Sequence, residues 1–209
     1  MLKYSKFLLW IGYAYFTFLL LLITLQYVPY NTDVAFLRIK QDVVIHDYYK
    51  VVFFTHVYTS IFLMFVGAIQ FIVPIKKATK KLHHYSGRIY VFLILFLSGP
   101  SGLVMGYHAN GGLSSQISFV ILSLLWIFFT GIAIFYAIKK NIKAHQKFAL
   151  RSFALTLSAI SLRLFKYLIV LFFQLESIDA YRIVAWLGWT FNLMLVELYF
   201  FYKFSKLRQ

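Results

Sequence analysis

The sequence predicts an all-α polytopic membrane protein, with six transmembrane helices in a single integral membrane domain that covers residues 1–209. Three observations predict this fold. Of the 209 residues, 62% are hydrophobic, and a soluble domain of this length cannot bury so much apolar surface. The apolar residues form stretches long enough to cross a bilayer, which takes about 20 residues of helix. The basic residues, behind a net charge of +15, stand in short clusters between those stretches.

Taken in order, the apolar stretches are expected to form helices at residues 7–28, 49–73, 85–107, 117–138, 148–174 and 181–202. The first has a charged start like a signal peptide, but it is too long for one. Pro29 and Pro74 follow the first and second stretches, where a helix commonly stops. Pro100 lies inside the third, among serines and glycines, so we expect a kink there. Residues 30–48 form the longest connection.

The connections alternate in charge. Those predicted on one side hold basic residues and no acid, and they are the N-terminus, the loops near 76–84 and 139–147, and the C-terminus. The opposite connections hold acids, namely Asp33, Asp42, Asp47, Glu176 and Asp179. By the positive-inside rule, both termini are predicted to be cytoplasmic and residues 30–48 to lie outside. We expect a location in the cell (inner) membrane of a bacterium, with the lipid bilayer as the main partner.

Composition also excludes several classes of site. The chain contains no cysteine, which excludes disulfides, Fe–S clusters and c-type haem attachment. Any metal chemistry must therefore use histidine and carboxylate ligands. Nucleic-acid binding is not expected, because the basic residues form short loops between apolar stretches rather than one face of a folded domain.

Polar side chains inside a bilayer are expensive, so each one needs an explanation. On the second helix, His56, Ser60, Gly67 and Gln70 fall on one face. This face is either a packing stripe of small and polar residues or part of a site that binds a ligand or handles protons. On the sixth helix, Asn192 and Glu197 are further candidates for buried polar residues.

Arg163 is predicted to lie deep in the apolar zone of the fifth helix, where an arginine needs a partner. Glu197 is the obvious acid, but its depth suits Arg151 better. Arg163 is then expected to face carbonyl groups, a water cavity or a bound anion such as a haem propionate or a lipid phosphate. A purely structural role stays open. Lys166, one turn further along, is expected to snorkel to the outer interface.

Two short motifs carry a family resemblance. His83 to Tyr90 follows the pattern H-x-x-x-G-R-x-Y, and His145 to Ser152 follows H-x-x-x-x-x-R-S. Both resemble elements of an uncharacterised bacterial multi-pass membrane protein family, a domain of unknown function. The resemblance covers roughly residues 50–200, and other positions fit in order, namely His56, Gly67, Gln70, Gly111, Gly112, Arg163, Asn192 and Glu197. His108 does not fit the pattern, and Phe148-Ala149 stands where an aromatic residue and methionine are usual.

The resemblance implies no reaction, so three functions stay open, as does whether the protein is an enzyme. A looser fold-level similarity to six-helix b-type cytochromes suggests a redox protein, with a membrane redox partner. His83 (or its neighbour His84) and His145 would then ligate haem b or a metal, with His56 at a second site.

In that hypothesis, Arg88, Arg151 and Arg163 would contact the cofactor as anion-binding residues. A proton-coupled small-solute transporter would instead use His56, Arg163 and Glu197. The third possibility is an assembly or scaffold subunit without a ligand. The sequence leaves the oligomeric state open.

Overall fold

The computed structural model describes the backbone of residues 2–73 and 76–205 and the side chains of residues 7–73 and 76–203. Its long helices are α1 (Leu2–Leu25), α4 (Asp47–Ile72), α7 (Leu113–Ile138) and α10 (Ser177–Ser205). A continuous helical segment is formed by α5 (Lys80–Phe92), the π-helical η1 (Leu93–Ser98) and α6 (Gly99–Tyr107). Another pair is α8 (Ile142–Thr156) and α9 (Ser158–Phe173), and two short helices are α2 (Ala35–Arg38) and α3 (Gln41–Val44).

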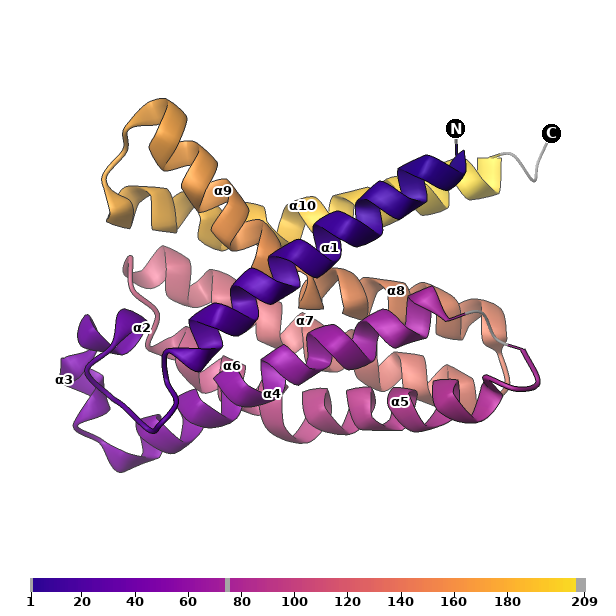
Figure 1. Cartoon of the computed structure of the whole chain (residues 1–209), viewed down its shortest axis with the longest axis horizontal. Coiled ribbons are helices and arrows are strands. Elements are labelled where there is room, and N and C mark those ends of the chain that lie inside the picture. Colours follow the sequence, from indigo (N-terminus) through magenta and orange to yellow (C-terminus); the bar gives the residue numbers. More distant parts are fainter. Residues whose placement is uncertain (1, 74–75, 206–209) are drawn as a thin grey trace.

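Within the described residues, five helical segments are long and apolar enough to cross a membrane. The pair α8 and α9 makes a sixth when it is counted as one broken span. Figure 1 shows these segments running back and forth along the long axis of the molecule. The predicted all-α, multi-pass fold is thereby confirmed.

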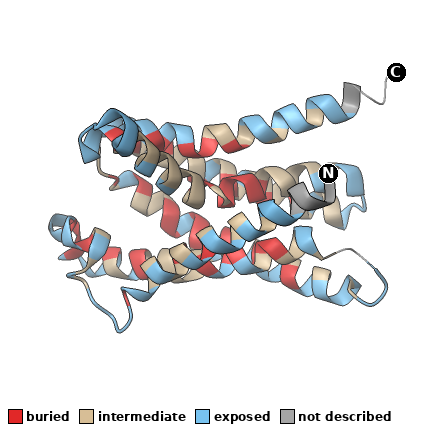
Figure 2. Ribbon diagram, turned by 45° about the horizontal axis from the view of Figure 1, so that its top comes forward, coloured by how far each residue is buried: buried red, intermediate tan, exposed pale blue. Residues whose placement is uncertain are grey.

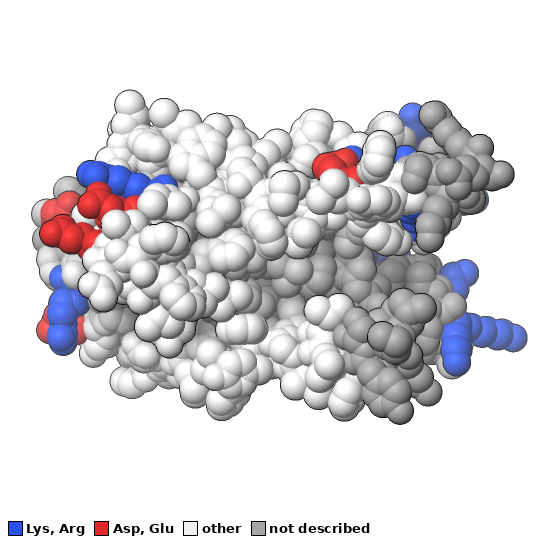
Figure 3. Space-filling model, turned by 90° about the horizontal axis from the view of Figure 1, so that it is seen from above, with Lys and Arg blue, Asp and Glu red and all other residues white. Residues whose placement is uncertain are grey.

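The two ends of the bundle carry different connections. The start of α1 and the end of α10 lie at the same end as the loops near residues 76–79 and 139–141, which we call the basic end (Figure 1). The other end holds residues 26–46, 108–112 and 174–176, and we call it the cap end. Figure 3 shows acidic and basic side chains together at the cap end and a broad uncharged belt beside them. This arrangement is what the alternation of charge along the sequence predicts.

The core lies where α4, α5, α7 and α8 meet. Leu63, Ile94 and Leu155 are almost fully buried there, and Trp126 packs with them. Gly67 allows α4 and α8 to approach closely, since a Cβ atom at this position would lie 2.8 Å from the Phe153 ring. The outward faces of the helices are exposed and largely apolar, and Figure 2 shows this for α9 and α10. These faces contact lipid in a membrane.

The third span departs from α-helical geometry just before Pro100. The N–H of Gly99 donates to the carbonyl of Ile94, five residues back, which is the hydrogen-bond pattern of a π-helix. Pro100 then stands in the first turn of α6, where its missing N–H costs little. The irregularity that Pro100 predicts is therefore taken up by the preceding turn.

The fifth predicted helix, residues 148–174, is two helices in the structure, with a bend of 41° at Leu157. The Thr156 hydroxyl bonds to the Ser152 carbonyl at 3.3 Å, and the Ser158 hydroxyl bonds to the Leu155 carbonyl. Hydroxyl groups that bond to a carbonyl of the preceding turn bend helices. The first half also begins earlier than predicted, because the Asn141 side chain caps it by accepting from the Ala144 N–H at 3.1 Å.

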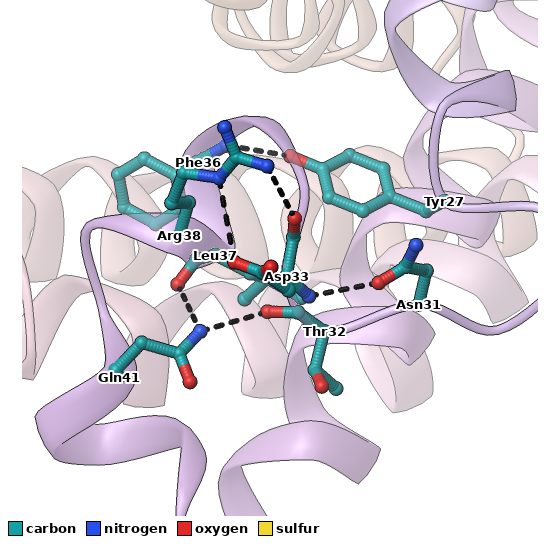
Figure 4. Close-up of polar contacts among 8 residues, drawn as sticks. All are labelled: Tyr27, Asn31, Thr32, Asp33, Phe36, Leu37, Arg38 and Gln41. Atoms are coloured by element: carbon teal, nitrogen blue, oxygen red, sulfur yellow. Dashed lines mark hydrogen bonds and ion pairs between the residues drawn. The ribbon is translucent and has the colours of Figure 1, made fainter.

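Residues 26–46, which we call the cap, fold over one end of the bundle. Figure 4 shows its polar contacts: the Tyr27 hydroxyl accepts from the Phe36 N–H at 3.2 Å, and Gln41 donates to the carbonyls of Thr32 and Leu37. Lys40 is only 6% exposed, and its ammonium donates to the His108 carbonyl at the end of α6. Lys40 thus ties the cap to the end of α6.

Candidate functional site

A cavity of about 470 Å³ lies in the half of the bundle nearer the cap. It is bounded by α1, α4, α6, α7, α8, α9 and the start of α10, and Tyr27 and Phe36 of the cap line it at one end. Most of its lining is apolar. The lining residues with polar side chains are Thr24, Tyr27, His56, Ser60, Ser123, Trp126, Thr156, Ser158, Arg163, Lys166 and Tyr181. His56 and Arg163, which the sequence singles out separately, are therefore brought to one cavity.

Arg163 lies on α9 and points into this cavity. Its Nη1 donates to the Ala159 carbonyl, one turn back, at 2.8 Å. No ion pair joins it to a carboxylate in the part of the chain that the structure describes. Titratable groups that interact with it electrostatically include Tyr27, Tyr181 and His56. The guanidinium therefore keeps most of its N–H donors free toward the cavity.

His56 lies on α4, across the cavity. Its Nδ1 is 2.9 Å from the Ser98 carbonyl of η1, so this nitrogen carries the proton and donates it. That assignment leaves Nε2 with a lone pair in the neutral ring. Gly102 makes room for the imidazole, because a Cβ atom there would lie 2.9 Å from its Cε1 atom. The predicted polar face of the second helix is therefore a cavity wall at His56 and Ser60.

Glu197 pairs with Arg151, as their depths in the sequence predict. The two side chains form two hydrogen bonds, Nε to Oε1 at 2.6 Å and Nη2 to Oε2 at 2.9 Å. The expectation that Glu197 is buried is wrong, because 52% of its side chain is exposed on the outer face of α10. Asn192 is buried as expected, with its amide donating to the Ala154 carbonyl at 3.0 Å and accepting from Ser161.

Below the cavity floor, buried hydroxyl groups connect α5, α7 and α8. The Tyr90 hydroxyl lies 2.7 Å from Thr156 Oγ1 and 3.2 Å from Ser152 Oγ. Ser152 also contacts Thr130 at 2.7 Å, and the Trp126 indole donates to Thr156 at 3.1 Å. Every hydroxyl in this cluster has a partner, so the cluster holds the three helices together.

At the basic end, His83 and His145 lie at the same depth. His83 precedes Tyr90 on α5 by two helical turns, and His145 precedes Ser152 on α8 by the same number, about 10 Å along each helix. Tyr90 and Ser152 are in contact, and the two helices run in the same direction. The imidazoles interact electrostatically. His145 Nδ1 donates to the Ala133 carbonyl at 2.9 Å, which leaves its Nε2 free. His83 Nδ1 is buried and has no hydrogen-bond partner among the described residues.

The remaining predicted residues do not line the cavity. Arg88 is exposed and lies over the Tyr85 ring, 5.9 Å from its centroid. The Gln70 amide donates to the His83 carbonyl at 3.1 Å and to Ser86, which attaches α4 to α5. His84 is exposed. His108 is at the cap end with its Nε2 3.0 Å from the Tyr48 hydroxyl, so it does not meet His56.

Tyr27 and Tyr181 also line the cavity, which the sequence alone does not predict. Lys166 lines it as well, with its ammonium 5.7 Å from the centroid of the Tyr181 ring near the start of α10. The spacing of Arg163 and Lys166, which places both on one face of a helix, is the signal that could have found this pair.

No curated protein and no solved structure matches the chain. Residues 53–200 match a family described as predicted membrane protein (DUF2306). The matched residues include His56, His83, His145 and Arg163, and they agree with the range of the resemblance carried by the two short motifs. The chain therefore belongs to the DUF2306 family of predicted membrane proteins.

Proposed function

We propose that the protein binds a small organic anion in the cavity and carries it into or across the membrane. The observation that carries this proposal is Arg163, a cation that has no carboxylate partner among the described residues and that faces a cavity within the helix bundle. A charge surrounded by apolar groups is costly unless an opposite charge or several polar groups compensate it. One helix carbonyl satisfies only one of the guanidinium donors, and a bound anion would satisfy the others.

Other side chains around the cavity support an anionic ligand. Lys166 supplies a second cation on the same wall. His56 offers a lone pair at Nε2 when neutral and a second N–H donor when protonated, so it can bond to a ligand in either state. Its position opposite Arg163 fits a residue that exchanges a proton with the ligand during transport, which is the proton-coupled form of the proposal.

For the orientation, we propose that the basic end faces the cytoplasm of a bacterial cell. The support is the charge distribution, since lysine-rich loops stay on the cytoplasmic side of inner-membrane proteins. The cavity then opens in the outer half of the membrane. A ligand would be collected on that side and released past the hydroxyl cluster under Tyr90.

The experiment compares the purified protein with Arg163→Gln in lipid nanodiscs. A panel of anions (butanoate, succinate, inorganic phosphate and butyl phosphate) is scanned for ligands that raise the melting temperature, because a ligand that binds only the folded state stabilises it. We expect at least one anion to stabilise the unaltered protein and not Arg163→Gln. Uptake of that anion into proteoliposomes then measures transport.

Arg38→Gln is the matched control, since it removes the same charge from an exposed residue of the cap. It should respond to the anion like the unaltered protein. The proposal is wrong if no anion in the panel stabilises the protein, or if Arg163→Gln is stabilised equally.

A histidine-ligated redox centre, with haem b or a metal ion, is the second candidate. The observation that favours it is the pair His83 and His145 at one depth, with the Nε2 of His145 free. Two imidazoles fit an iron ligand set, and the unpartnered Nδ1 of His83 is consistent with a missing ligand. Bound haem would supply one-electron transfer. Of the arginines predicted to hold propionates, Arg151 is occupied by Glu197 and Arg88 points outward.

A visible absorption spectrum tests this second candidate. Protein expressed with added haem should show a Soret band that is lost in His83→Ala and in His145→Ala. His84→Ala changes an exposed neighbour and should keep the band. A folded protein that stays colourless under these conditions, or a band that survives both substitutions, would exclude it.

A further inference from the structure

The cavity has a charged wall and an apolar remainder. Arg163 and Lys166 lie on one face of α9, and Tyr181 stands beside them. The side chains facing them across the cavity are mainly aliphatic, aromatic or methionine, as at Leu20, Ile61, Met64, Met105 and Leu122. A ligand that fills this space must therefore place its charge at α9 and an apolar body against the other walls.

We propose that the ligand is a single-chain amphiphilic anion, with a carboxylate or phosphate head at Arg163 and Lys166 and an apolar tail in the rest of the cavity. This inference rests on the proposed function and specifies its substrate class. A fully hydrophilic anion would satisfy Arg163 but would leave the apolar walls in contact with water, which is unfavourable. An apolar tail removes that water.

The walls suit a flexible chain. Met64 and Met105 can adapt their shape to a tail, because methionine is unbranched and polarisable. The volume of about 470 Å³ is in the range of pockets for small ligands. It accommodates one chain, and a phospholipid with two long chains is too large for it.

The opening of the cavity also favours a lipid-derived ligand. The cap closes the end that faces water, with Tyr27 and Phe36 in the lining and Lys40 bonded to the His108 carbonyl. On the side, α1 and α9 pack together near Leu20 and Ala159 and diverge toward the cap end (Figure 1). Arg163 is exposed although it lies within a membrane span. A ligand would thus enter sideways from the lipid, between α1 and α9.

The test is a series of n-alkyl carboxylates, from butanoate to tetradecanoate, bound to the protein in phosphatidylcholine nanodiscs. Empty nanodiscs correct for partition into lipid. We expect the affinity to rise by about fourfold for each methylene group, as burial of a methylene in an apolar site predicts, until the cavity is full. Arg163→Gln should lower the affinity of every member by the same factor, on the order of tenfold, because it removes the bond to the head and not to the tail.

A second variant examines the apolar part alone. Leu122→Trp fills part of the cavity and should shorten the chain length at which the affinity stops rising. Leu124→Trp is the control, since Leu124 is 51% exposed, lies outside the cavity lining and faces lipid. A parallel series of n-alkyl phosphates determines the head group, and the same dependence on chain length in either series supports the inference.

Three contrary outcomes are distinguishable. If short anions bind through Arg163 but the affinity does not grow with chain length, the ligand is a hydrophilic anion; the inference then fails while the proposed function stands. If neither series depends on Arg163, both fail. A chain-length dependence that Leu122→Trp leaves unchanged would place the tail in another site and also overturn the inference.

Discussion

Arg151 and Glu197 form an ion pair with two hydrogen bonds, of 2.6 and 2.9 Å, that joins α8 to α10. The guanidinium also lies within 5.9 Å of the ring centroids of Phe129, Phe148 and Phe200. Glu197 therefore compensates a cation in the basic half of the bundle. Arg163 lines the cavity in the other half and has no carboxylate partner among the described residues.

Glu197→Gln should lower the free energy of unfolding by about 1–2 kcal/mol, because it leaves Arg151 with a weaker acceptor among aromatic rings. In the double variant with Arg151→Met, the loss should be smaller than the sum of the two single losses, since the two residues interact directly. Thermal unfolding in nanodiscs measures all three variants.

Asp47→Asn serves as the control for this pair. Its carboxylate is 94% exposed next to Lys50, and such surface ion pairs contribute little to stability, so no measurable change is expected. Additive losses at positions 151 and 197 would contradict the pairing.

Arg163→Met should make the ligand-free protein more stable, by about 1–3 kcal/mol, because it replaces an uncompensated charge with an apolar side chain. The gain should be accompanied by loss of stabilisation by anions. The melting temperature with and without ligand measures both effects. Arg38→Met, at an exposed and paired arginine, should change neither quantity. A less stable Arg163→Met protein would mean that the guanidinium is needed to hold the bundle together.

Gly67→Ala should lower stability by about 1–3 kcal/mol, as overpacking of a core does. The added methyl group would lie 2.8 Å from the Phe153 ring, and that ring cannot move away because it is stacked against Phe71 at 4.5 Å. Gly131→Ala makes the same change where no atom lies within 4 Å, so it should be neutral or stabilise the helix by up to about 1 kcal/mol. Equal effects at both positions would contradict the packing of α4 against α8.

Mild acid should loosen the cap at His108. Burial, followed by the charge of Lys40, lowers the pKa of His108 below its ordinary value of 6.5; His46 acts in the same direction and Asp42 opposes them. A base with a lowered pKa binds fewer protons in the folded than in the unfolded state, so stability is full above pH 6.5 and falls as the pH drops below it. Hydrogen exchange of residues 35–48 at pH 7.5 and pH 5 should show faster exchange at the lower pH.

His108→Gln is the matched comparison for this pH effect, because a glutamine amide can still bond to the Tyr48 hydroxyl but does not titrate. The difference in exchange between the two pH values should become smaller in this variant. An undiminished difference would contradict the assignment of the pH dependence to His108.

Much of the fold can be predicted because its signals are local. The apolar stretches and the alternation of charge are properties of short segments, and they predict the order and direction of the spans. The depths of Arg163, Arg151 and Glu197 in the membrane follow from counting residues along the helices. That count is sufficient to predict that Arg151 pairs with Glu197 and that Arg163 faces another group.

The parts that could not be predicted depend on contacts between segments. The bend at Leu157 requires hydroxyl-to-carbonyl bonds at Thr156 and Ser158, which the same residues do not always make. The lining of the cavity by Tyr27 and Lys166 depends on how the cap and α9 pack. The outward direction of Arg88 depends on the rotation of α5, and no feature of its motif specifies that rotation.

The break at Leu157 has a mechanical consequence. The half of the span before it, α8, is fastened to α5 and α7 through Ser152 and Thr156. The half after it, α9, leans away from the bundle and carries both cavity cations. A small rotation of α9 about Leu157 would therefore change the volume of the cavity and the position of its two cations while α8 stayed fixed.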